Sequence, residues 1–261
     1  RKGASSIGKM SKFLMPLPFV IILVFLIRGL TLSGAGDGVA ALFTPQMALL
    51  AQPTTWTTAV SQILFSASAG LATLTTYASY SPTDAPIVRN AAIVCVTNSL
   101  FSLAAGTAVF SFVGHLAHET GEPLMKVVTA GPALAFEVFP VAISMLPLPQ
   151  LWSVLFFAML LNLGLPSAVS MTSPLCLAAT EAIAPNRPTA VSAAIHLVGC
   201  LTGLIMYTSR AGPYWIHVND HFVPLFLTIA VALSECVVVS FAYGARRLVH
   251  QLPRRDQRFE S

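Results

Sequence analysis

The chain has 261 residues, of which 55% are hydrophobic and only 9% are charged. Soluble domains carry about 25% charged residues, so this chain lacks the polar surface of a soluble protein. Its formal net charge of +4 does not indicate nucleic-acid binding, because the basic residues flank apolar runs and are explained by membrane topology.

Six apolar runs are long enough to cross a bilayer as helices, which takes about 20 residues. They cover residues 13–32, 57–80, 88–116, 149–173, 189–209 and 222–247. The predicted fold class is an all-α membrane protein of about six transmembrane helices, with one partial transmembrane domain (1–250) and a cytoplasmic tail (251–261). The chain begins with Arg1, not Met, and no cleavable signal precedes the first run, so we expect a fragment.

The orientation follows from the basic residues, since cytoplasmic loops of membrane proteins are enriched in Lys and Arg. Eleven of the 14 Lys and Arg fall on one side of the six predicted spans. They are Arg1, Lys2, Lys9, Lys12, Arg89, Arg187, Arg246, Arg247, Arg254, Arg255 and Arg258. Both termini are therefore predicted to be cytoplasmic.

The second run has an unusual centre, Ser66-Ala67-Ser68-Ala69-Gly70, with no large side chain. Such residues favour a helix broken near 66–70, and broken backbone at membrane depth is tolerated where protein or a cavity surrounds it. In secondary transporters, interrupted helices near the midplane hold substrate and ions. The alternative is a small-residue face for close helix packing.

Proline interrupts the fourth run at Gly164-Leu165-Pro166-Ser167. Pro166 has no N–H, so it leaves the carbonyl of Asn162 without its helical partner and kinks the helix. A free carbonyl beside a Ser hydroxyl suits an alkali cation, but a kink without a ligand is equally common. The segment 117–147 before this run is apolar and proline-punctuated, and we expect short helices there.

Several stretches, in order along residues 1–250, resemble the neurotransmitter:sodium symporter family. They are Leu26-Ile27-Arg28-Gly29-Leu30-Thr31-Leu32, Gln62-Ile63-Leu64-Phe65-Ser66, Tyr77-Ala78-Ser79-Tyr80, Gly131-Pro132-Ala133-Leu134-Ala135-Phe136, Leu163-Gly164-Leu165-Pro166-Ser167 and Phe241-Ala242-Tyr243-Gly244. The resemblance covers the fifth to tenth helices of the family. It implies a multi-pass plasma-membrane symporter of inverted-repeat fold that couples sodium, and also chloride, to a small amino acid, amine or neurotransmitter.

Two sodium sites are implied by the resemblance. Ser66 and Asn98 match ligands of the first sodium, and the Leu163 carbonyl and Ser167 match ligands of the second. The family usually has Asp or Thr where this chain has Pro166, so the second site lacks a side-chain ligand.

A chloride site is implied at Gln62, Ser66 and Ser102. Chloride-independent members of the family have a carboxylate at the position of Ser102, so its absence implies chloride dependence. Taken without the resemblance, Ser66 and Ser102 could equally hydrogen-bond to their own helices.

Substrate-lining and gating positions are also implied. The substrate-lining positions are Phe65, Ser68, Leu71 and Ala168. Leu71 replaces an aromatic residue that normally covers the substrate. Asp220 matches the acidic member of the outer gate, and Glu235 is either a functional acid at membrane depth or a neutral structural one. His196 is expected to be an interhelical polar residue.

Two other classes of function stay open. A non-transporting relative could act as an accessory membrane subunit, an alternative that Pro166 and Leu71 favour. An intramembrane enzyme is the other, but neither G-x-S-x-G nor H-E-x-x-H is present. The expected partners are a small-molecule substrate, membrane lipid and other membrane helices, without nucleic acid.

Overall fold

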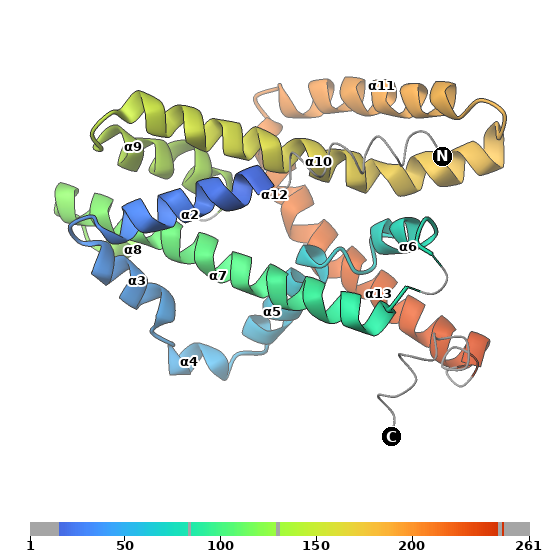
Figure 1. Cartoon of the computed structure of the whole chain (residues 1–261), viewed down its shortest axis with the longest axis horizontal. Coiled ribbons are helices and arrows are strands. Elements are labelled where there is room, and N and C mark those ends of the chain that lie inside the picture. The colour runs from blue at the N-terminus through green and yellow to red at the C-terminus, as the bar shows by residue number, and fades with distance from the viewer. Residues whose placement is uncertain (1–15, 83–84, 129–130, 245–246, 248–261) are drawn as a thin grey trace. The chain divides into compact units, whose positions relative to one another are not determined.

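The computed structural model describes residues 16–82, 85–128, 131–244 and 247. These residues form helices, and no strand occurs among them (Figure 1). In chain order the helices are α2 (Pro16–Leu30), α3 (Ala35–Phe43), α4 (Met47–Leu50), α5 (Pro53–Ser66), α6 (Thr73–Ala78), α7 (Ile87–Thr120), α8 (Leu124–Val127), η1 (Leu134–Val138), α9 (Phe139–Ser144), α10 (Pro149–Ile183), α11 (Pro188–Tyr207), α12 (Gly212–Phe222), η2 (Val223–Leu227), α13 (Thr228–Val237) and η3 (Val238–Gly244). The η elements are π-helical. The predicted all-α fold is confirmed.

The chain divides into two compact units. Unit 1 holds the chain up to Met47 together with Val96–Ser167, and unit 2 holds Ala48–Cys95 together with the chain from Ala168 onwards. The helices α7 and α10 each run from one unit into the other. The single domain of residues 1–250 stays a prediction, and the predicted tail 251–261 lies outside the described residues.

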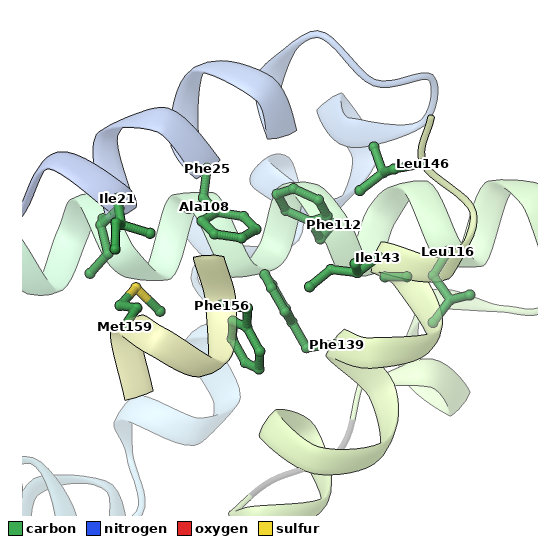
Figure 2. Packing of buried hydrophobic residues seen from close by; sticks show 12 residues of the cluster. Ile21, Phe25, Ala108, Phe112, Leu116, Phe139, Ile143, Leu146, Phe156 and Met159 are labelled. Atoms are coloured by element: carbon green, nitrogen blue, oxygen red, sulfur yellow. The ribbon is translucent and has the colours of Figure 1, made fainter. Parts of the chain in front are cut away.

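The core of unit 1 is an apolar cluster to which α2, α7, α9 and α10 each contribute a phenylalanine (Figure 2). Phe25, Phe112, Phe139 and Phe156 are all buried. The rings of Phe139 and Phe156 stack with centroids 4.5 Å apart, and Phe25 lies 5.6 Å from Phe112. Because lipid tails are as apolar as these rings, dispersion contacts stabilise the cluster more than removal from water does.

Glycines allow the first span to pack directly against α7. The chain bends by 113° between α2 and the helical segment after it, and Gly34 at the bend has φ +75°. A Cβ on Gly38 would lie 1.9 Å from the carbonyl oxygen of Phe110, and a Cβ on Gly114 would lie 2.6 Å from that of Gly34. No other residue fits at these positions without a backbone shift.

Three of the predicted spans are continuous helices long and apolar enough to cross a membrane, namely α7, α10 and α11. The first predicted span becomes a fourth if α2 and its bent continuation count together. Its residues 13–15 lie outside the described part. The helix α10 continues to Ile183, past the predicted end at residue 173, because transmembrane helices tolerate a proline such as Pro174. The sixth run contains the shorter apolar helix Thr228–Gly244.

The second span is interrupted where the sequence predicts a break. The helix α5 ends at Ser66 and α6 begins at Thr73. Between them Ser68, Gly70 and Ala72 have φ values of 57°, 73° and 55°. Left-handed backbone is costly for residues other than glycine, so the surrounding structure must hold this segment. The broken-helix interpretation is therefore confirmed.

Small residues also serve close packing in this span, as the alternative interpretation proposed. In unit 2, a Cβ on Gly70 would lie 2.9 Å from the carbonyl oxygen of Thr228 and 3.1 Å from the backbone nitrogen of Ala232. The broken segment therefore lies directly against α13. The segment 117–147 contains the short elements α8, η1 and α9, which confirms the expected short helices.

Candidate functional site

Unwound backbone is the central feature of the candidate site. The N–H of Ser68 donates to the carbonyl of Phe65 and that of Ala69 donates to Leu64, both at 2.9 Å. No backbone N–H of the described residues donates to the carbonyl oxygens at positions 67–70. Four carbonyl oxygens within an apolar span are thus left for water, an ion or a ligand. Sodium is a hard cation for which such oxygens are suitable ligands.

Five of the residues predicted from the sequence lie on or beside this break. Gln62 and Ser66 are one turn apart at the end of α5, where i and i+4 share a face, and both are exposed. Phe65, Ser68 and Leu71 are half-buried. Residues assigned to sodium, chloride and substrate therefore meet at one short segment of unit 2.

A cavity of about 350 Å³ lies between the break and α13 within unit 2. Its lining includes Ser68 and Gly70 from the break, Thr75 from α6, and Glu235 and Cys236 from α13. The carboxyl group of Glu235 forms no hydrogen bond or ion pair with any residue that the structure describes, although its backbone carbonyl accepts from the N–H of Val238. The hydrogen-bonded structural role that the sequence left open for Glu235 therefore finds no partner in this part of the chain.

The remaining ligands of the first sodium and of chloride belong to unit 1. Asn98 and Ser102 are one turn apart on α7, so their side chains project from the same face of the helix. Asn98 is half-buried and Ser102 is exposed. The ligands predicted for the first sodium and for chloride therefore belong partly to unit 2 and partly to unit 1.

The predicted second sodium site lies near the middle of α10. The hydroxyl of Ser167 donates to the carbonyl oxygen of Leu163 at 2.8 Å. This bond brings the two predicted ligands together, and it is also the self-satisfied arrangement common for serine in membrane helices. The Oδ1 atom of Asn162 is buried without a hydrogen-bond partner. Ala168, the fourth substrate-lining position, follows Ser167 and belongs to unit 2.

Two further predicted residues lie on other helices of unit 2. Asp220 is exposed near the end of α12, and no ion pair to it occurs within the described residues. His196 joins α11 to α10, since its Nε2 lies 3.3 Å from the hydroxyl of Thr172 and its Nδ1 lies 2.7 Å from the carbonyl of Ser192. The prediction that His196 is an interhelical polar residue is confirmed.

Sequence reasoning missed two polar contacts between distant segments. In unit 1, His115 is buried and its Nδ1 lies 3.0 Å from the carbonyl oxygen of Ser33. The hydroxyl of Ser33 donates to the carboxylate of Glu119 at 3.2 Å. In unit 2, the hydroxyls of Tyr77 and Ser170 lie 2.7 Å apart. A polar residue inside an apolar run is a usable signal for such contacts, but it does not identify a partner more than 80 residues away.

Comparison with known proteins identifies the family. A model of the Sodium:neurotransmitter symporter family matches residues 1–256. The chain is 33% identical over 250 residues to the sodium- and chloride-dependent glycine transporter 1 of Xenopus laevis, covering 94% of this chain and 39% of that protein. It is 35% identical over 257 residues to the sodium- and chloride-dependent neutral and basic amino acid transporter B(0+) of Mus musculus, covering 96% and 40%.

A third relative, the sodium-dependent transporter snf-5 of Caenorhabditis elegans, is 35% identical over 250 residues, covering 95% of this chain and 34% of the relative. The chain therefore spans about two fifths of the length of these curated relatives or less. All three are named as transporters, so the intramembrane-enzyme alternative is set aside. With a family match over nearly its whole length, the chain belongs to the sodium:neurotransmitter symporter family.

Proposed function

We propose that this chain forms part of a symporter that couples sodium and chloride to the movement of a small amino acid or amine, and that it contributes ligands to the ion and substrate sites. The observation that carries the proposal is the break between α5 and α6, whose carbonyl oxygens at positions 67–70 accept no backbone hydrogen bond from the part of the chain that the structure describes. Interrupted helices of this kind bind substrate and ions in secondary transporters.

Sodium is proposed to bind at two places. The first ion takes the Ser66 hydroxyl and the Asn98 amide oxygen, and the second takes the Leu163 carbonyl and the Ser167 hydroxyl. The Leu163 carbonyl keeps a second lone pair for a cation while it accepts the bond from Ser167. Pro166 contributes no side-chain oxygen, so the second site is expected to bind sodium more weakly than the first.

Chloride is proposed to bind at Gln62, Ser66 and Ser102. These side chains are neutral and can donate hydrogen bonds to an anion. Two sodium ions would otherwise leave positive charge uncompensated at low dielectric, which is costly. Both curated relatives from Xenopus and mouse are named as chloride-dependent.

The substrate is proposed to lie against Phe65, Ser68, Leu71 and Ala168. The names of the Xenopus and mouse relatives, a glycine transporter and a neutral and basic amino acid transporter, favour an amino acid over an amine. Asp220 and Glu235 are proposed as gate residues. The protein would lie in the plasma membrane with both ends of this chain cytoplasmic, and would expose the site to each side in turn.

The test is uptake by a hybrid in which this chain replaces the 250 residues that it matches in the Xenopus glycine transporter 1. We expect accumulation of radiolabelled glycine in sodium chloride and background accumulation when choline replaces sodium. Surface biotinylation reports whether the hybrid reaches the plasma membrane, and the unmodified Xenopus protein is the positive control. A hybrid present at the surface that accumulates no more glycine in sodium than in choline would refute the proposal.

The second candidate function is an accessory subunit that does not transport. Two departures from the family pattern favour it, the missing ligand at Pro166 and the missing aromatic cover at Leu71. The same hybrid distinguishes the two functions when Pro166→Asp and Leu71→Phe restore the family residues. Uptake that appears only after both substitutions would favour the accessory role for the natural sequence.

A further inference from the structure

The helix after the break, α6, cannot be stable alone. It has six residues, Thr73–Ala78, and follows backbone in which Ser68 and Ala72 have positive φ. Isolated helices shorter than about 12 residues are marginal even in favourable sequences. The position of α6 must therefore depend on contacts with the rest of unit 2.

One side-chain hydrogen bond ties α6 to another helix. The Tyr77 hydroxyl lies 2.7 Å from the Ser170 hydroxyl on α10, and both residues are half-buried. The other side-chain hydrogen bonds that the structure describes for residues 73–81 are local, with partners no more than four residues away, from Thr73 to Leu71, from Ser79 to Thr76 and from Ser81 to Tyr77. Separating Tyr77 from Ser170 would leave two hydroxyls unpaired in an apolar environment, which opposes the movement of α6.

The same short helix forms one wall of the cavity beside the break. Leu74 and Thr75 of α6 line it, opposite Glu235 and Cys236 of α13. Any displacement of α6 from α10 must change the access to this cavity. Ser170 also follows Ser167, a proposed sodium ligand, by less than one helical turn on α10.

We propose that Tyr77 and Ser170 are a positioning pair that holds the second half of the broken span in place and so fixes the α6 wall of the cavity beside the break. Neither residue is assigned to an ion or to the substrate. The pair acts through α6, by setting the equilibrium between docked and displaced positions of that helix. This inference rests on the proposed function, because displacement of α6 has a role only if the protein alternates between conformations as a symporter does. Its test does not require transport.

The test is the rate at which a methanethiosulfonate reagent labels the thiol introduced by Thr76→Cys, at a buried position of α6, in the 261-residue chain in lipid nanodiscs. None of the four cysteines forms a disulfide, so Cys95→Ser, Cys176→Ser, Cys200→Ser and Cys236→Ser leave the thiol of Thr76→Cys as the single one. Tyr77→Phe and Ser170→Ala each remove one hydroxyl and little volume. We expect each to raise the labelling rate about threefold, the size of an average interhelical hydrogen bond in a membrane.

The pairing itself is tested by combining the variants. If the two hydroxyls act only on each other, Tyr77→Phe with Ser170→Ala labels no faster than either alone. Ser170→Thr keeps a hydroxyl and should restore the original rate. An unchanged rate in Tyr77→Phe, or an additive effect in the double variant, would overturn the proposal.

Matched controls separate positioning from general loosening. Ser173 donates to the carbonyl of Val169 on its own helix, and Tyr214 is 76% exposed, so Ser173→Ala and Tyr214→Phe should leave the labelling of the Thr76→Cys thiol unchanged. In a second set of variants, exposed Cys200 on α11 is the single thiol. Its labelling rate should be the same with and without the substitutions at Tyr77 and Ser170. Faster labelling at both cysteines would mean a loosened fold and would overturn the positioning role. If the hybrid fails to transport while the Thr76→Cys thiol responds as expected, the proposed function fails and the positioning pair stands.

Discussion

Single polar residues in apolar runs were the most informative feature of the sequence. Ser66 and Ser68 lie at the break, and Ser167 bonds to Leu163, as expected for residues that neighbour one another in the chain. Tyr77 could not be assigned a role in this way, because its partner Ser170 is 93 residues away and the contact depends on helix packing. Local chemistry is readable from sequence, whereas long-range pairing requires the fold.

The charge at residue 102 should decide how the protein depends on chloride. In the hybrid transporter, Ser102→Glu places a fixed carboxylate where we propose that chloride binds. We expect uptake to become largely independent of chloride, because the carboxylate offsets the sodium charge in place of the ion. The measurement is initial uptake with gluconate in place of chloride.

The control for this substitution is Ser102→Ala, which removes the hydroxyl without adding charge. It should raise the chloride concentration needed for half-maximal uptake by about 10- to 100-fold, the effect of losing a hydrogen bond to a charged group. If the unmutated hybrid takes up substrate equally well in gluconate, chloride coupling is absent and the assignment of Gln62, Ser66 and Ser102 is wrong.

At the scale of helices, the break between α5 and α6 was predictable and the bend after α2 was not. A run of five small residues without a large side chain is a local signal for broken backbone. The bend of 113° depends on close packing between α3 and α7, where Gly38 lies against the backbone of α7 and Gly114 of α7 lies against the backbone at the bend. A glycine in an apolar run can have several roles, so the sequence alone does not identify the segment that it contacts.

Two glycines of α3 should respond in opposite ways to the same substitution. A Cβ on Gly38 would lie 1.9 Å from the carbonyl oxygen of Phe110, so Gly38→Ala must separate α3 from α7. We expect a loss of about 1–3 kcal/mol of stability, as for an overpacked core. Gly36 has nothing within 4 Å of a Cβ, and Gly36→Ala should be neutral or stabilise by up to about 1 kcal/mol.

Denaturation of the purified chain in mild detergent, followed by the loss of helical circular dichroism, measures both variants against the unmutated chain. The two residues are on the same short helix, so differences in expression or in detergent affect them alike. Equal midpoints for Gly38→Ala and Gly36→Ala would show that α3 does not pack against α7 as described.

At the scale of the whole chain, the apolar surface exceeds what a monomer in water would expose. The 18-residue apolar window of α11 has no buried residue, and Ile205 in that helix is 76% exposed. These side chains are positioned to contact lipid or further helices. The family match identifies a multi-pass membrane protein, in which apolar surface of this kind faces lipid or a neighbouring helix.

The last prediction concerns the 261-residue chain on its own, which we expect not to bind sodium measurably. The family resemblance implies that the first helix of a complete symporter faces the broken span and supplies part of each ion shell. Without it, Ser66, Asn98 and Ser167 offer too few oxygens to replace the water that sodium loses on binding. The test is sodium-dependent binding of radiolabelled glycine to the purified chain by scintillation proximity, with the Xenopus transporter as the positive control. Saturable binding that Asn98→Ala abolishes would mean that these helices suffice, and that the proposed division of each ion shell between this chain and further helices is wrong.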